Sequence, residues 1–92
     1  MDYNRMMNEA YMLAQDAMGK LRGAVHLLLI TGGSAGLSNA QIGRSLGIYS
    51  GHVGHEGHVS RTILALMEAE GVVRQDARTK RWHLREHQEA TD

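Results

Sequence analysis

The sequence lacks cysteine and proline. Its formal net charge is zero, because it has ten Lys and Arg residues and ten Asp and Glu residues. Without cysteine, the chain can form no disulfide, no thiolate zinc site and no cysteine nucleophile. Without proline, glycine becomes the main residue that marks turns and helix ends. Zero net charge is uncommon in nucleic-acid-binding proteins, so the distribution of charge along the chain carries more information than the total.

Long apolar runs are also absent. The apolar run of residues 27–30, for example, is far shorter than the roughly 18 residues that cross a bilayer. The N-terminal segment carries Asp2 and Glu9 and lacks the apolar core of a secretory signal. We therefore expect a cytoplasmic protein with no membrane partner. A chain of 92 residues is long enough for one domain and too short for two.

Apolar residues recur at alternating intervals of four and three in the first third of the chain. The stripe consists of Tyr3, Met7, Ala10, Ala14, Ala17, Leu21, Ala24 and Leu28. This spacing predicts helices over about residues 3–18 and 20–31, either separate or continuous. Gly19 and Gly23 weaken the middle of the run by ~1 kcal/mol each. A helix over residues 3–18 is more than a small domain needs, so we expect a homodimer through this helix.

A second helical signal begins at Ser38, which is followed by Gln41 in a capping-box arrangement, and it ends at Gly47. A stronger helix is predicted over about residues 56–70. Its expected buried stripe is Val59, Ile63, Leu66 and Met67, and Gly71 is expected to end it in the left-handed conformation.

The C-terminal part reads as a basic hairpin. Residues 72–75 and 81–85 are expected strands, with a turn over residues 76–80. Between Gly71 and Arg85 the chain has five basic residues and one acid, so a neutral protein can still present a basic face. Trp82 is expected to pack in the core.

Three stretches, LSNAQIGRSLGI, HVSRTILALMEAEGVV and RQDARTKRWHL, resemble the winged helix-turn-helix family of bacterial regulators. The resemblance implies a mainly α fold with a small β-hairpin and, here, an extra N-terminal helix. We divide the chain into an N-terminal helix and possible dimerisation element (1–19), a winged helix-turn-helix domain (20–85) and an acidic tail (86–92).

The same resemblance implies binding of double-stranded DNA. The recognition helix, residues 56–70, would enter the major groove, and the basic wing, residues 72–85, would contact the backbone or minor groove. The candidate DNA-binding residues are Asn39, Gln41, Arg44, His58, Ser60, Arg61, Thr62, Arg78, Lys80 and Arg81. We expect a transcriptional regulator or a plasmid or phage accessory protein. The alternative is a protein-interaction winged helix that acts as an assembly module or as part of a larger machine.

The segment over residues 47–58 departs from the family, whose two helices are joined by about three or four residues. Either the recognition helix begins near Ser50, or the segment is an insertion. It also holds His52, His55 and His58, weak candidates for a zinc or nickel site in a metal- or pH-responsive regulator. Their spacing matches no closed tetrahedral pattern, so we expect no cofactor. The sequence contains neither GxxxxGK[ST] nor HExxH, and we expect no enzyme.

Overall fold

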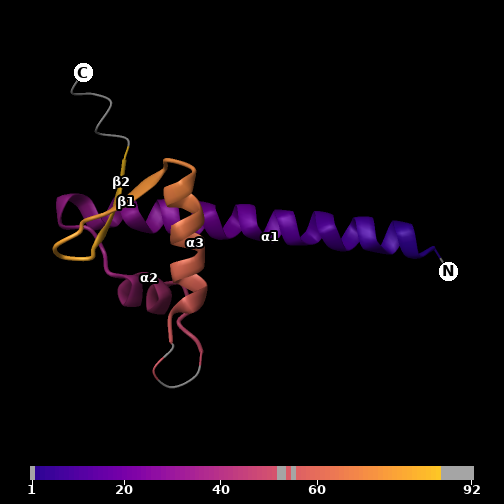
Figure 1. Cartoon of the computed structure of the whole chain (residues 1–92), viewed down its shortest axis with the longest axis horizontal. Coiled ribbons are helices and arrows are strands. Elements are labelled where there is room, and N and C mark those ends of the chain that lie inside the picture. Colours follow the sequence, from indigo (N-terminus) through magenta and orange to yellow (C-terminus); the bar gives the residue numbers. More distant parts are fainter. Residues whose placement is uncertain (1, 52–53, 55, 86–92) are drawn as a thin grey trace.

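A computed structural model describes residues 2–51, 54 and 56–85 of the chain. In chain order the elements are α1 (Tyr3–Gly32), the 3-10 turn η1 (Gly33–Ala35), α2 (Asn39–Ser45), α3 (His58–Ala69), β1 (Val73–Gln75) and β2 (Trp82–Leu84). The two strands form an antiparallel hairpin (Figure 1). The expected class, mainly α with a small β-hairpin, is confirmed.

Helix α1 is one continuous helix, which decides between the two alternatives left by its sequence. Asp2 caps its start, where the carboxylate accepts a 3.0 Å hydrogen bond from the backbone N–H of Arg5. Gly19 and Gly23 lie inside the helix and do not interrupt it. Its second half packs in the core through Val25 and Leu29, whereas its first half extends away from the rest of the molecule (Figure 1).

Helix α2 begins as its sequence predicts. The Ser38 hydroxyl accepts from the N–H of Gln41 (3.1 Å), and the Gln41 side chain accepts from the N–H of Ser38 (2.8 Å), which completes the capping box. The helix ends at Ser45, just before Gly47 with a φ of 72°. Local signals were sufficient at both ends of this short helix.

Helix α3 is buried along a different line from the one expected. Leu64 is completely buried, whereas Leu66 is 38% exposed, so the prediction that Leu66 lies in the buried stripe is wrong. The buried residues are Ser60, Ile63, Leu64 and Met67, which follow the i, i+3, i+4, i+7 spacing of one helix face. The helix ends before Gly71, which has a φ of 80° as expected.

Every element except η1 contributes to one apolar core. The core consists of Val25, Leu29, Ile42, Ile63, Leu64, Met67, Val73 and Trp82. Trp82 is 5% exposed, which confirms its expected packing role.

The hairpin is joined to the segment before α2. In its register Val73 lies opposite Leu84, and Gln75 lies opposite Trp82. Leu37 also pairs with Trp82: its N–H donates to the Trp82 carbonyl (3.1 Å), and the Trp82 N–H donates to the Leu37 carbonyl (2.7 Å). This bridge fixes the position of the hairpin relative to the start of α2.

Candidate nucleic-acid interface

The outer face of α3 carries three of the candidate residues. His58, Arg61 and Thr62 are all exposed in the first half of the helix, with the small, exposed Ala65 one turn further on. Arg61 donates a long 3.5 Å bond to the Glu56 carbonyl, and the Thr62 hydroxyl donates to the His58 carbonyl at 2.8 Å. The face therefore offers a cation and polar groups to a partner, and Ala65 leaves room for close approach.

Ser60 does not belong to this face. It is completely buried, and its hydroxyl lies 2.8 Å from Asn39 Oδ1 and 3.0 Å from the Gly57 carbonyl. The Asn39 side chain also donates to the Gly57 carbonyl (3.0 Å). Ser60 is therefore corrected from a DNA-contacting residue to a buried polar link, and partly buried Asn39 is its partner. Together they hold the start of α3 against the start of α2.

The other two candidates on α2 are exposed but have roles inside the protein. Gln41 completes the capping box with Ser38. The Arg44 guanidinium lies over the Tyr49 ring, 4.6 Å from its centroid, in a cation–π contact. A phosphate at this helix end would have to compete with the capping box, whereas Arg44 keeps its charge on the surface.

Helix α3 begins at His58 and not near Ser50. The backbone loops back on itself, since the Gly57 N–H donates to the Ser50 carbonyl at 3.0 Å. Tyr49 lies against two glycines: an added Cβ would come within 2.8 Å of its ring at Gly43 and 2.6 Å at Gly57. Sequence reasoning missed this role of Tyr49, for which the only signals were an internal glycine in α2 and a glycine just before α3.

The proposed histidine cluster lies mostly outside the described residues, since only His58 of the three is described. In the described part of the segment, both carboxylate oxygens of Glu56 accept from the Gly54 N–H at 3.0 Å. Within the described ranges, no group of three His, Cys, Asp or Glu side chains is placed to hold a metal ion.

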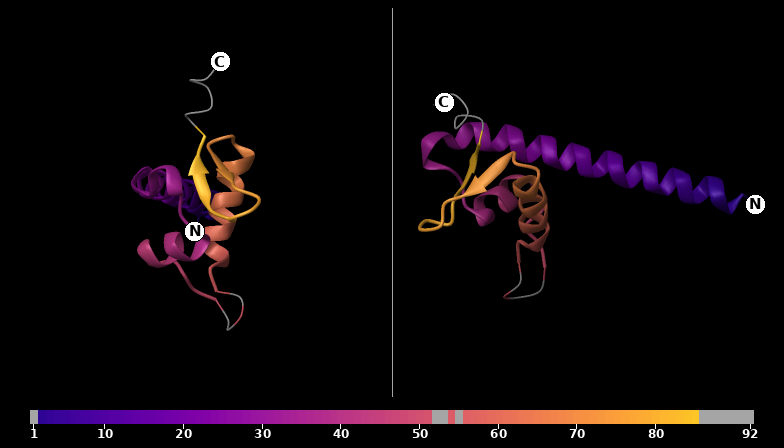
Figure 2. Two further views of the ribbon diagram at one scale, coloured as in Figure 1. Left: turned by 90° about the vertical axis from the view of Figure 1, so that its left-hand side faces the viewer. Right: turned by 45° about the horizontal axis from the view of Figure 1, so that its top comes forward.

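The turn of the hairpin is a structured loop that presents two cations. Figure 2 shows this turn projecting from the body of the molecule on the side away from α1. Arg78 and Lys80 are exposed there, and Lys80 has a φ of 65°, in the left-handed region. Arg81 is partly buried, and its guanidinium donates to the Gly36 carbonyl (3.1 Å). Arg81 therefore also ties the hairpin to the segment after η1.

Asp76 organises this turn. Its Oδ1 accepts from the backbone N–H of Thr79 (2.8 Å) and of Arg78 (2.9 Å). These hydrogen bonds, that from Thr79 first, hold the pKa of the Asp76 carboxyl below its ordinary value of 3.8. The stabilisation is complete above the ordinary pKa and is lost as pH falls through the lowered pKa of the folded state.

We therefore expect Asp76→Ala to lower the melting temperature more at about pH 7 than at acidic pH, where the wild-type carboxyl loses its charge as the pH falls through its lowered pKa. Thermal unfolding of both proteins followed by circular dichroism checks this. An equal deficit at both pH values would contradict the assignment.

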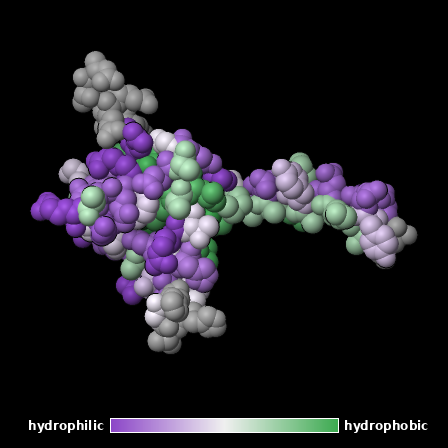
Figure 3. All heavy atoms as spheres, viewed as in Figure 1, coloured by the Kyte–Doolittle hydropathy of each residue, from purple (hydrophilic) through white to green (hydrophobic). Residues whose placement is uncertain are grey.

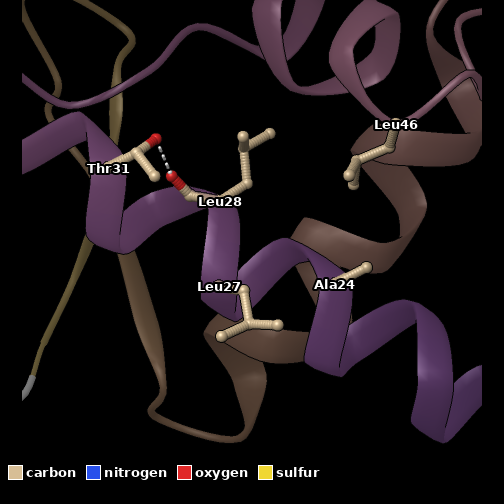
Figure 4. Close-up of a pocket in the computed structure, with 5 residues that line it drawn as sticks. All are labelled: Ala24, Leu27, Leu28, Thr31 and Leu46. Atoms are coloured by element: carbon tan, nitrogen blue, oxygen red, sulfur yellow. Dashed lines mark hydrogen bonds between the residues drawn. The ribbon is translucent and has the colours of Figure 1, made fainter.

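An apolar groove lies between α1 and the end of α2, lined by Ala24, Leu27, Leu28, Thr31 and Leu46 (Figure 4). The Thr31 hydroxyl donates to the Leu28 carbonyl at 2.6 Å, so it is already engaged. The groove is open, and its lining residues include no acidic or basic side chain.

The chain also presents no candidate membrane segment in its described ranges, where no helix combines the length and the apolar character that a bilayer crossing requires. Comparisons with known protein families, with curated proteins and with solved structures found no match to this chain.

Proposed function

We propose that this chain is a winged helix-turn-helix protein that binds double-stranded DNA, with the first half of α3 in the major groove. The observation that carries the proposal is the outer face of α3, where His58, Arg61 and Thr62 are exposed while the opposite face is buried. An α-helix fits the major groove, and an arginine there can donate two hydrogen bonds to guanine O6 and N7. We assign this readout to Arg61.

The hairpin turn supplies the second contact in this proposal. Arg78 and Lys80 are exposed on a loop that the Asp76 side chain holds in shape. The Asp76 carboxylate accepts hydrogen bonds from two backbone N–H groups, so part of its hydrogen-bonding capacity is used within the turn. Contacts between such cations and phosphates supply affinity and salt dependence rather than sequence choice.

Burial and hydrogen bonds within the protein reduce the number of candidate residues that can contact DNA. The proposed interface consists of His58, Arg61, Thr62, Arg78 and Lys80, with Arg44, which is exposed on α2, as a further candidate. Ser60 is buried, and Asn39, Gln41 and Arg81 have partners inside the protein. A role as a transcriptional regulator or as a plasmid or phage accessory protein is consistent with a small DNA-binding domain of this kind.

The proposal predicts salt-dependent binding to a random duplex of ~30 base pairs, with a dissociation constant of about 1–100 µM near physiological salt. Arg61→Ala combined with Lys80→Gly should weaken binding and reduce the slope of log K against log salt by about 1, because Lys80 is the proposed phosphate contact and Arg61 the proposed base contact. Glycine is used at residue 80 because it tolerates the left-handed φ of Lys80. Fluorescence anisotropy at several salt concentrations measures both quantities.

Arg5→Ala with Lys20→Ala is the matched control, because it also removes two exposed positive charges, but from α1. Its salt slope should stay close to that of the wild type. Absence of binding at low salt, or equal losses in both double variants, would contradict the proposal. The α3 face would then be better explained as a site for a protein partner, because the exposed part of Leu66 makes this face partly apolar.

A further inference from the structure

The first half of α1 is a helix without a tertiary partner in the described structure. Every residue from Tyr3 to Ala17 is exposed, and this part of the helix extends away from the core (Figure 1). Isolated helices of about 12–15 residues are marginal in water. Gly19 and Gly23, at its base, lower its intrinsic stability further. A persistent helix of this length therefore needs a surface that covers it.

One side of this segment is apolar and free of charge. The stripe from Tyr3 through Met7, Ala10, Ala14 and Ala17 runs into Leu21, which packs against the core. Figure 3 shows apolar side chains gathered along one edge of the extended helix. Met6, Tyr11 and Leu13 flank the stripe and are 51%, 62% and 71% exposed.

The charged residues of the segment lie outside the stripe and its flanks. Arg5 pairs with Glu9 at 3.2 Å, and Asp16 pairs with Lys20 at 3.1 Å, both within the helix. No charge on the stripe between Tyr3 and Ala17 selects a partner of opposite sign, and none opposes a second copy of the same surface.

We propose that a second copy of this chain covers the stripe in an antiparallel helix pair. In the proposed register Tyr3 lies opposite Leu21 of the second copy, Met7 opposite Ala17, and Ala10 opposite Ala14. The two-fold axis then passes at the level of Met12. The inference rests on α1 alone and is independent of the proposed DNA binding.

The sizes of the side chains support this register. At its centre Ala10 faces Ala14, which lets the two backbones approach closely, and further out each Met7 faces an alanine. Large side chains opposite small ones fill the space between helices without gaps. A parallel pair would instead place Met7 against Met7 and would stack three successive layers of alanine, which leaves the interface poorly filled.

The direction of the helix pair decides where the two domains lie. The second half of α1 is covered by its own core, with Val25 and Leu29 buried. An antiparallel pair places the two cores at opposite ends of the helix pair, whereas a parallel pair brings them together at the same end. A two-fold axis also makes the interface self-complementary, with Tyr11 and Leu13 of both copies beside the axis.

The area is sufficient for a specific contact. Covering the exposed parts of Tyr3, Met6, Met7, Tyr11 and Leu13 in both copies removes on the order of 1,000 Å² of surface from water, near the lower limit for a stable interface. We therefore expect a reversible dimer rather than an obligate one.

Sedimentation equilibrium of the full chain tests whether a second copy covers the stripe. Leu13→Glu places two carboxylates beside the axis in an apolar contact, so it should raise the dimer dissociation constant at least about tenfold. Met12→Glu is the matched control. Met12 is 61% exposed but lies about two and a half turns after Tyr3, on the opposite side of the helix, so this variant should dimerise like the wild type.

A wild-type chain that stays monomeric up to about 100 µM, the concentration at which even a weak dimer forms, would overturn the proposal. Equal effects of the two variants would also overturn it. In either case a different protein would have to cover the stripe. A trimer or tetramer would overturn the pairwise contact.

Single cysteines test the direction, because the natural chain has none. Neither Met7→Cys alone nor Ala17→Cys alone should cross-link under mild oxidation. In the antiparallel register the introduced cysteine of one copy lies far from the same cysteine of the second copy. An equimolar mixture of the two proteins should form the mixed disulfide, because residues 7 and 17 then face each other within the few ångströms that a disulfide spans. Cross-linking of Met7→Cys with itself, or failure of the mixture, would overturn the register.

Discussion

Leu64→Ala should lower the free energy of unfolding by about 3 kcal/mol, whereas Leu66→Ala should lower it by less than about 1 kcal/mol. Leu64 is completely buried in the core, so its truncation removes apolar contacts and leaves a cavity. Leu66 is 38% exposed, and the space left by its truncation opens to solvent. The two residues are of one type, on one helix, and differ only in where they point.

Chemical denaturation of both variants followed by circular dichroism measures this difference. Both substitutions replace leucine by alanine inside α3, so the gain in helix propensity is the same and cancels in the comparison. A larger loss for Leu66→Ala than for Leu64→Ala would mean that α3 is rotated about its axis relative to the structure described. Arg61 and Thr62 would then no longer share the exposed face.

The features that the sequence predicts well are those decided by neighbouring residues. The capping box of Ser38 and Gln41 is a contact across three residues, and the left-handed Gly71 ends α3 through the conformational freedom of glycine itself. The strands and the turn over residues 76–80 are local in the same sense. Such signals fix where elements begin and end with little help from the rest of the fold.

The buried face of α3 could not be fixed in this way. Val59, Ile63, Leu64, Leu66 and Met67 offer two overlapping apolar lines, and the sequence pattern alone does not decide between them. The line through Leu64 is selected by packing against the core. It also turns Ser60 inward, which is acceptable only because Asn39, 21 residues away in the sequence, and the neighbouring Gly57 carbonyl supply hydrogen-bond partners.

The exposure of the candidate interface residues was accordingly predicted in part. Arg61, Thr62, Arg78 and Lys80 are exposed as expected, because long charged and polar side chains on helix faces and turns rarely have room inside a small domain. Arg81 was predicted as a contacting residue on the same grounds, but its bond to the Gly36 carbonyl links residues 45 positions apart. The pairing of Leu37 with Trp82 was missed for the same reason, since no periodicity in either stretch indicates the other.

Gly57→Ala should be more destabilising than Gly71→Ala, although both replace a glycine next to α3 that has a left-handed φ, 82° and 80°. The left-handed conformation costs an alanine about 1–2 kcal/mol at either position. At Gly71 an added Cβ meets nothing within 4 Å, and that strain is the whole cost.

At Gly57 the added Cβ would lie 2.6 Å from Tyr49 Cε1 and 2.7 Å from Asn39 Nδ2, which adds about 1–3 kcal/mol of overpacking. The displaced groups are the ones that hold α3 in place, because Asn39 and Ser60 both bond to the Gly57 carbonyl and the Gly57 N–H bonds to Ser50. Gly57→Ala should therefore also weaken the proposed DNA binding even at temperatures where the variant is folded, by shifting His58 and Arg61 at the start of α3. Denaturation curves and anisotropy titrations of the two variants measure both effects. Equal stability losses would show that the Tyr49 contact yields easily, and unchanged DNA binding by folded Gly57→Ala would argue against a reading role for the first turn of α3.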